Sequence, residues 1–284
     1  MLLTLSVSSL GPLIKSESPR LSLLDVPAFV RDSLGLHGLC FSTDLLKGAN
    51  RADLDRLRDR ADKQACSCLL LEDPDPLSFA HPDSDQAALA VDRARRVLQA
   101  AQILGCNAAA VRVQSPSDEL ALDRAIQRLR EAVEYAERLE VNLLIAPHEG
   151  LTSQADQVTD LIKRVGGFRI GTLPDFAAAA ASPDPVTYLR RLTPYAAVVI
   201  ASTVEFDSLD APADDQVLDV QDLLSDHVPV HTAFDLQPMV EAVISVGFDV
   251  TLAINFRGQA DPVPAILASQ AALEHAIERA SQKD

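Results

Sequence analysis

The residues best suited to chemistry in this chain are polar side chains that end or directly follow short apolar segments. Glu72, Asp175 and Asn255 end three such segments, Arg112 lies near the end of a fourth, and His148 directly follows a fifth. A histidine such as His148 can act as a general base, and a carboxylate such as Asp175 or Glu72 can act as the acid. Arg112 can polarise a carbonyl group or hold a carboxylate. The candidate substrate contacts are Arg112, Gln114, Ser202, Asn255 and Arg257.

Each charged candidate also has a structural role open to it. Arg112 can form an ion pair with Glu72 or Asp175, which would leave it no free charge for a substrate. His148 stands in the turn sequence APHEG and can fix that loop through a hydrogen bond. Asp175 precedes the helical sequence FAAAA, where an aspartate commonly caps the first turn. The residue types alone leave both kinds of role open.

The elements that must position these residues alternate between apolar and helical segments. Eight aliphatic segments recur, and nearly every one is followed by a segment with helical spacing of apolar residues. This alternation predicts a single (β/α)8 barrel, a closed sheet of eight parallel strands, over residues 1–284. Active sites of such barrels lie at the C-terminal ends of the strands, so the candidates should meet at one end. The expected strands are 2–8, 35–42, 65–72, 107–113, 141–147, 169–175, 196–202 and 249–255.

Alternation of residue types along a strand indicates which side chains point into the barrel. In the last expected strand, Leu252, Ile254 and Phe256 share the face that suits packing against helices. Ala253 and Asn255 therefore point inward. The same parity argument turns Phe41 toward the helices, whereas Phe176 could still stack on a ligand.

Two polar segments are expected to be loops on the side that carries the candidates. The sequence EDPDP at 72–76 follows the third expected strand, and a long acidic segment at 207–226 follows the seventh. Loops on that side of a barrel usually shape the pocket.

The composition limits the classes of partner. Lys and Arg number 25 against 41 Asp and Glu, which gives a formal net charge of −16. Such a surface repels phosphate backbones and anionic lipids, so neither nucleic acid nor membrane is expected as a partner. No apolar run approaches the roughly 20 residues of a membrane span. Three of the four cysteines fall in expected strands and Cys106 directly precedes one, so we expect buried, reduced thiols and a cytoplasmic location.

Four short sequences resemble a known family. They are IAPHEGL at 145–151, LPDF at 173–176, VGF at 246–248 and LAINFRGQADP at 252–262. Together with the order of elements, they are similar to the xylose isomerase-like TIM barrels. That superfamily includes sugar and sugar-phosphate isomerases and epimerases and endonuclease IV-type enzymes. The resemblance implies a polar substrate pocket at the strand ends and, typically, a divalent metal ion held there.

The positions that the resemblance assigns to metal ligands are mostly changed. Ala146 stands where the family has a glutamate, Ile200 lies in the stretch that carries a histidine, and Asn255 replaces a second glutamate. Asp175 is kept, but a divalent ion needs several hard donors to offset its dehydration. We therefore expect a degenerate metal site and no metal cofactor, with Arg112 or Arg257 as the new partner of Asp175.

Two functions from different classes follow. The first is a non-catalytic descendant that binds a small polar molecule or a protein partner, including a second copy of itself. The second is a metal-independent isomerase, epimerase or lyase acting on a small sugar-like or hydroxy-acid substrate. In that enzyme His148 would be the base, Asp175 or Glu72 the acid, and Arg112 the group that polarises the carbonyl. An apolar plug between Ala146 and Ile200 would favour the binding protein.

Overall fold

Eight parallel strands form one curved sheet in the computed structural model, which describes residues 1–16, 18–207 and 228–282. Within these residues the strand order is β6-β5-β4-β3-β2-β1-β8-β7. The prediction of eight parallel strands is confirmed. The acidic segment 207–226 lies outside the described residues after Asp207. The strands are β1 (Leu2–Ser6), β2 (Gly38–Ser42), β3 (Ser67–Leu77), β4 (Ala108–Val113), β5 (Asn142–Ala146), β6 (Ile170–Thr172), β7 (Val198–Thr203) and β8 (Thr251–Phe256).

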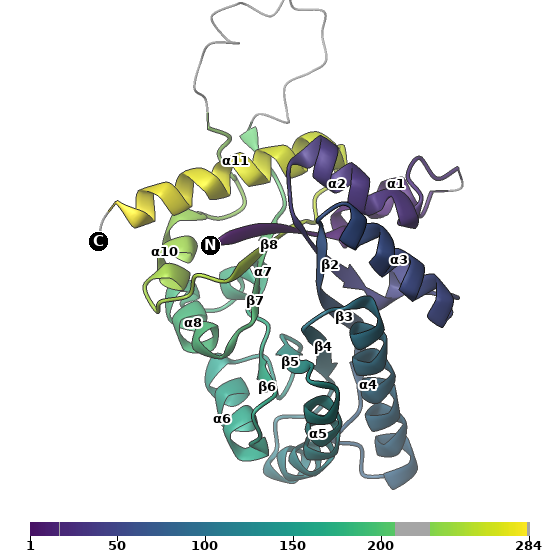
Figure 1. Ribbon diagram of the computed structural model, residues 1–284. Coiled ribbons are helices and arrows are strands. Elements are labelled where there is room, and N and C mark those ends of the chain that lie inside the picture. The colour runs from purple at the N-terminus through teal and green to yellow at the C-terminus, as the bar shows by residue number, and fades with distance from the viewer. Residues whose placement is uncertain (17, 208–227, 283–284) are drawn as a thin grey trace, which may run out of the picture.

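The helices begin and end at residues that suit helix termini. Asp118 accepts a hydrogen bond from the backbone N–H of Ala121 and so caps α5 (Glu119–Leu139). Gly105, in the left-handed conformation, directly follows α4 (Ser84–Leu104). Figure 1 shows the helices arranged around the outside of the sheet. No helix in the described part of the chain is both long and apolar enough to cross a bilayer. The α-helices are α1 (Gly11–Ile14), α2 (Val26–Leu34), α3 (Arg51–Lys63), α4 (Ser84–Leu104), α5 (Glu119–Leu139), α6 (Ala155–Val165), α7 (Phe176–Ala180), α8 (Pro185–Leu192), α10 (Gln237–Ile244) and α11 (Pro262–Ser281).

The first and last strands of this order, β6 and β7, approach each other at two points. Isolated parallel bridges join Thr172 to Ala196 and Asp175 to Ile200. The backbone N–H of Ile200 donates to the carbonyl of Pro174 at 2.8 Å. Contact between these two strands therefore rests on single bridges, whereas every other neighbouring pair has a run of paired residues.

The third strand differs from the prediction, because it continues through the segment 72–76 that was expected to be a loop. Pro76 pairs with Arg112 after a register shift, and prolines are tolerated at such irregularities. Asp73 is fully buried there. Its carboxylate accepts from Thr43 Oγ1 at 2.7 Å and from Arg93 Nε and Nη2 at 2.7 and 3.0 Å. These bonds satisfy the buried charge that the sequence pattern assigned to solvent.

Two other expected strands are shorter than predicted. The first ends at Ser6, because Val7–Leu10 forms a 3-10 helix, and the sixth covers only Ile170–Thr172. The polar residues that were expected to end these strands therefore lie in the segments that follow.

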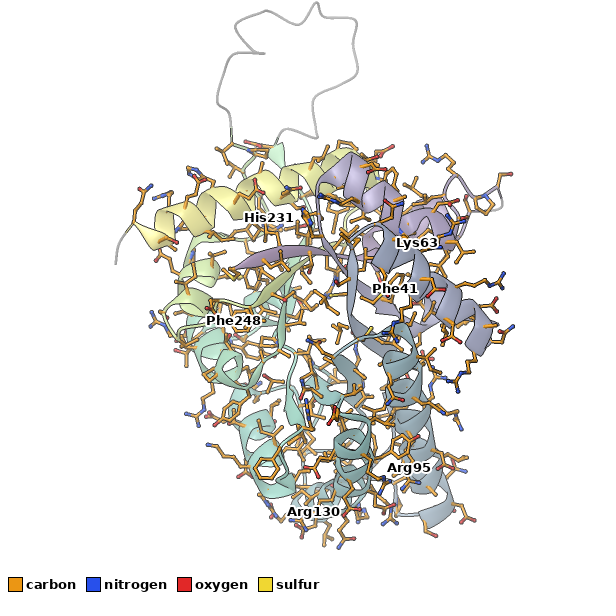
Figure 2. The ribbon with its side chains drawn as sticks, in the orientation of Figure 1. Phe41, Lys63, Arg95, Arg130, His231 and Phe248 are labelled. Atoms are coloured by element: carbon orange, nitrogen blue, oxygen red, sulfur yellow. The ribbon has the colours of Figure 1, made fainter. Side chains whose placement is uncertain are left out.

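Side chains on the two faces of the sheet form two separate apolar clusters. The larger cluster joins one face to the helices and includes Phe41, Leu252 and Ile254. Figure 2 shows Phe41 inside the fold, among the side chains of the sheet and its helices. The smaller cluster takes the alternate residues, including Ala253, and so fills the inside of the curved sheet. Its members are Cys40, Leu70, Ala108, Ala110, Leu144, Ala146, Leu173, Val198, Ile200 and Ala253, and the predicted parity is confirmed.

Candidate functional site

A cavity of about 290 Å³, here called the mouth cavity, lies at the C-terminal ends of the strands. It brings together four of the charged candidates from β3, β4 and the segments after β6 and β8. Its floor is apolar, because Ala146 and Ile200 belong to the cluster inside the sheet. The lining residues are Glu72, Arg112, Ala146, Pro147, Leu173, Asp175, Ala177, Ala178, Ile200 and Arg257. Ala177 and Ala178 on α7 were not predicted as lining residues. Their small side chains leave room for the cavity beside the helix.

Asp175 is the most highly connected polar group of the mouth cavity and is only 7% exposed. One carboxylate oxygen accepts from Ser202 Oγ at 2.7 Å and from the backbone N–H of Ala177 at 2.8 Å. The other accepts from Nη2 of Arg257. Asp175 thus caps α7 and pairs with an arginine, and both structural roles are confirmed.

Arg257 is held from a second side by Asn255. With its amide oxygen turned toward the guanidinium, Asn255 accepts from Nε and Nη2 of Arg257 at 3.0 Å each. The guanidinium therefore lies between the side chains of Asp175 and Asn255. Charge-assisted hydrogen bonds of this kind fix the orientation of a planar guanidinium.

A second ion pair of the cavity joins β4 to the neighbouring strand β3. Nη2 of Arg112 donates to Oε1 of Glu72 at 2.7 Å, and the two side chains are 31% and 19% exposed. The Nε atom of Arg112 is buried and has no hydrogen-bond partner among the described residues. The two pairs give the mouth cavity two positive and two negative side chains, so its formal charge is zero.

Tyr188 on α8 extends this polar region below the surface. Burial raises the pKa of its phenol, and the negative charge of Asp175 raises it further. The hydroxyl group is buried and lacks a hydrogen-bond partner among the described residues. The phenol therefore stays protonated and available as a donor near the mouth cavity.

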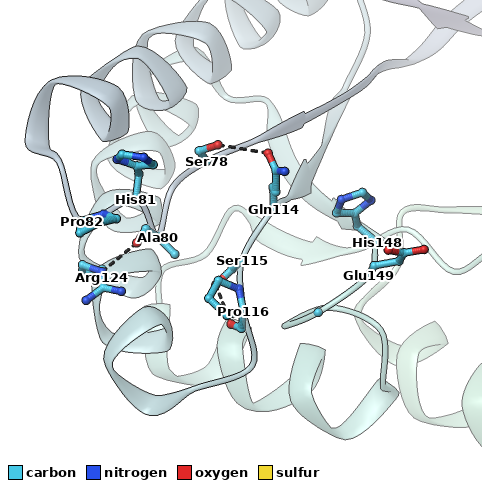
Figure 3. Close-up of a pocket in the computed structure, with 11 residues that line it drawn as sticks. Ser78, Ala80, His81, Pro82, Gln114, Ser115, Pro116, Arg124, His148 and Glu149 are labelled. Atoms are coloured by element: carbon cyan, nitrogen blue, oxygen red, sulfur yellow. Dashed lines mark hydrogen bonds between the residues drawn. The ribbon is translucent and has the colours of Figure 1, made fainter.

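His148 and Gln114, two further candidates, line a different cavity. This one, here called the side cavity, has a volume of about 470 Å³ and lies among the loops after β3, β4 and β5. Figure 3 shows His148 on one side of it, with Gln114 next to Ser78. The two cavities share no lining residue. The structure therefore places the predicted base in one cavity and the predicted acids Asp175 and Glu72 in the other.

The comparison with known families decides the identity of the fold. The family described as xylose isomerase-like TIM barrel matches residues 33–278. The chain belongs to this family. No curated protein matches the sequence of this xylose isomerase-like barrel with significance.

Solved structures with similar folds include several sugar epimerases. L-ribulose 3-epimerase has a TM-score of 0.77 at 16% identity, with 100% of this chain and 97% of that chain covered. D-psicose 3-epimerase with D-tagatose, from Clostridium cellulolyticum H10, has a TM-score of 0.71 at 12% identity, with 99% of each chain covered. The IOLI protein with a binding zinc atom has a TM-score of 0.72 at 14% identity, covering 98% and 99%. At these identities the likeness concerns the fold of the xylose isomerase-like barrel.

The side chains of this xylose isomerase-like barrel do not fit a divalent ion at the mouth cavity. Ala146 and Ile200 offer no donor atom at two of the positions that the resemblance assigns to ligands. At the other two, Asp175 and Asn255 turn their oxygens to the guanidinium of Arg257. Within residues 1–16, 18–207 and 228–282, no group of three or more His, Cys, Asp or Glu side chains is arranged to hold a metal ion.

Proposed function

We propose that this xylose isomerase-like barrel binds a small, uncharged polar molecule of the sugar type in the mouth cavity, without catalysing its conversion. The observation that carries the proposal is the guanidinium of Arg257 between Asp175 and Asn255. The positively charged guanidinium of Arg257 forms hydrogen bonds with the two polar side chains that would otherwise face a metal ion. The apolar side chains of Ala146 and Ile200 complete this replacement.

The balance of charges supports an uncharged ligand. Arg112 and Arg257 are each neutralised by a carboxylate within the cavity. An anionic ligand would have to displace one of these carboxylates and leave it without a cation, which is costly in a partly buried site. Hydroxyl groups instead can accept from the guanidinium edges and donate to the carboxylate oxygens without breaking either pair. At about 290 Å³ the cavity is also near the lower end of ligand pockets.

The absence of catalysis is proposed because each acid of the cavity already has a fixed partner. A general acid or base must exchange a proton with the substrate within hydrogen-bond reach. Glu72 and Asp175 accept from Arg112 and Arg257, so each carboxylate already has a partner within the protein. His148, the candidate base, lines the side cavity and not the mouth cavity.

Calorimetric titration tests the proposal with neutral ketoses, such as L-ribulose and D-tagatose, against the corresponding sugar phosphates and aldonic acids. We expect only the neutral sugars to bind in the mouth cavity. Glu72→Gln removes one negative charge from the cavity and should shift the preference toward the acids. Arg60→Gln, an exposed position on α3, should change nothing. Tighter binding of the phosphates by the unaltered protein would contradict the argument.

A metal-independent isomerase, epimerase or lyase is the second candidate, because Glu72 and Asp175 line one cavity. Proton exchange at the substrate carbon, followed by NMR in deuterated water with and without Mn²⁺, separates the two functions. Exchange without metal that is abolished in Asp175→Asn would establish the enzyme. Exchange that requires Mn²⁺ would contradict the proposed loss of the metal site.

The proposal extends to the surroundings of the protein. All four cysteines are free and buried, which supports a reducing, cytoplasmic location. The net charge of −16 supports a small polar molecule as partner in preference to nucleic acid or a membrane, and leaves a protein partner or a second copy open to test.

A further inference from the structure

The side cavity is built from three loops that are fixed to one another. A parallel bridge joins Ser115 to Gly150, and the backbone N–H of Leu151 donates to the carbonyl of Ser115 at 3.2 Å. Gly150 has a φ of +84°, and a Cβ atom there would lie 1.9 Å from the carbonyl oxygen of Ser115. On the opposite side, Nε of Arg124 donates to the carbonyl of Ala80 at 2.7 Å. These contacts therefore hold the loops that form the wall of the cavity in fixed positions relative to one another.

Most hydrogen-bond acceptors of this wall are already used within the protein. Nδ1 of His81 accepts from the backbone N–H of Asp83 at 3.1 Å, which leaves the proton on Nε2. Oε1 of Gln114 accepts from Ser78 Oγ at 3.2 Å. The carbonyl of Ala80 is taken by Arg124. The side chains of His81, Gln114 and Arg124 keep further donors after these bonds are made.

Besides the ring of His148, the remaining donors come from three side chains that line the same cavity. They are the Nε2–H of His81, the amide nitrogen of Gln114 and the two Nη groups of Arg124, none of which has a bond within the described part of the chain. Glu149 is the one acidic side chain of the lining. Figure 3 shows it beyond His148 and directed away from Gln114 and Arg124.

We propose that the side cavity is a binding site for a small organic monocarboxylate. One guanidinium with no carboxylate partner matches one negative charge, and its Nη groups suit the two oxygens of a carboxylate. Ala80, Pro82 and Pro116 supply an apolar surface for the carbon part of the ligand. The acidic surface of the protein slows the approach of an anion, but charges beyond about 10 Å are screened at moderate salt. The neighbouring donors therefore decide the affinity.

This site is independent of the mouth cavity and of its proposed sugar ligand, because the two share no lining residue. The probe is a panel of aliphatic and aromatic monocarboxylates, each paired with its uncharged primary amide, with inorganic phosphate as a further anion. Binding to the full chain is followed by titration calorimetry and by the ring signals of His81 and His148 in NMR spectra. We expect millimolar or tighter binding of at least one acid and weaker binding of its amide.

Variants assign the binding to this cavity. Arg124→Gln and Gln114→Leu should each lower the affinity for the acid, the first by about tenfold or more. Arg128→Gln, one turn along α5 and outside the cavity lining, should leave it unchanged. Gln114→Leu keeps the Arg124–Ala80 bond, so its result stands even if Arg124→Gln disturbs the loop.

Three results would overturn the proposal. The first is a complete lack of millimolar binding across the acid panel. The second is equal binding of an acid and its amide, or of inorganic phosphate and the acid, which would remove the basis for a monocarboxylate. The third is unchanged binding in both Arg124→Gln and Gln114→Leu.

Discussion

Replacing Asp175 by asparagine tests whether this carboxylate is a structural partner of Arg257 or a group kept free for chemistry. The change keeps one oxygen for Ser202 and Ala177, but it turns an N–H group toward Nη2 of Arg257. A charge-assisted hydrogen bond contributes about 1.5–3 kcal/mol to stability. Arg257 is 39% exposed and keeps its bonds to Asn255, so water recovers part of the loss. The expected destabilisation is about 1–2 kcal/mol.

Urea unfolding followed by circular dichroism measures this loss, and the thermal midpoint should fall by about 2–6 °C. Arg257→Gln and the double variant complete a mutant cycle, in which the coupling between the two side chains should be favourable and close to 1 kcal/mol. Asp249→Asn, an exposed position before β8, serves as the control and should change stability by less than about 0.5 kcal/mol. A rise in the midpoint of Asp175→Asn would refute the structural role, because relief of an unpaired charge stabilises a fold.

Three further predictions concern other parts of the molecule. Asp73→Asn should cost more than Asp175→Asn, about 2–4 kcal/mol by urea unfolding, because three hydrogen bonds converge on a carboxylate that is fully buried. Gly150→Ala should lower the thermal midpoint further than Gly48→Ala, since both have a positive φ but only Gly150 faces a backbone atom at 1.9 Å; equal shifts would contradict this. Burial raises the pKa of Cys66 to about 11 and that of Cys68 to about 12, so native thiols should react with a disulfide reagent only after unfolding. Because the unfolded thiols lose their protons first, stability should fall as pH rises above about 9, and a stability that is flat to pH 11 would contradict this.

The order of strands and their buried faces could be predicted because both depend on local patterns. Aliphatic segments followed by helices indicate a parallel sheet, and alternation along β8 separates Ala253 from Leu252 and Ile254. The end of β3 could not be predicted in this way. A segment with two prolines and two aspartates has the composition of a loop, and only Arg93 and Thr43, 20 and 30 residues away, make the burial of Asp73 tolerable.

The residues of the candidate site could be predicted, but their separation into two cavities could not. The ion pairs of Arg112 and Arg257 were among the alternatives that charge alone suggests, and the structure contains both. The separation of His148 from Asp175 depends on the path of the chain after β5. That path is set by the bridge between Gly150 and Ser115, a contact over 35 residues that no local pattern records.

Because β6 and β7 meet through two single bridges, Asp175 helps to hold these strands together in addition to lining the mouth cavity. Its backbone forms one of the bridges, while its side chain reaches Ser202 on β7 and Arg257 after β8. An anion that pairs with Arg257 in place of Asp175 therefore also weakens the contact between β6 and β7. An uncharged ligand leaves that contact unchanged. Exchange of the Ile200 amide hydrogen, which is bonded to the carbonyl of Pro174 between β6 and β7, should slow with neutral sugars and stay unchanged with acids, which are not expected to bind there. In this xylose isomerase-like barrel the charge of a ligand in the mouth cavity therefore affects how firmly β6 and β7 are held together.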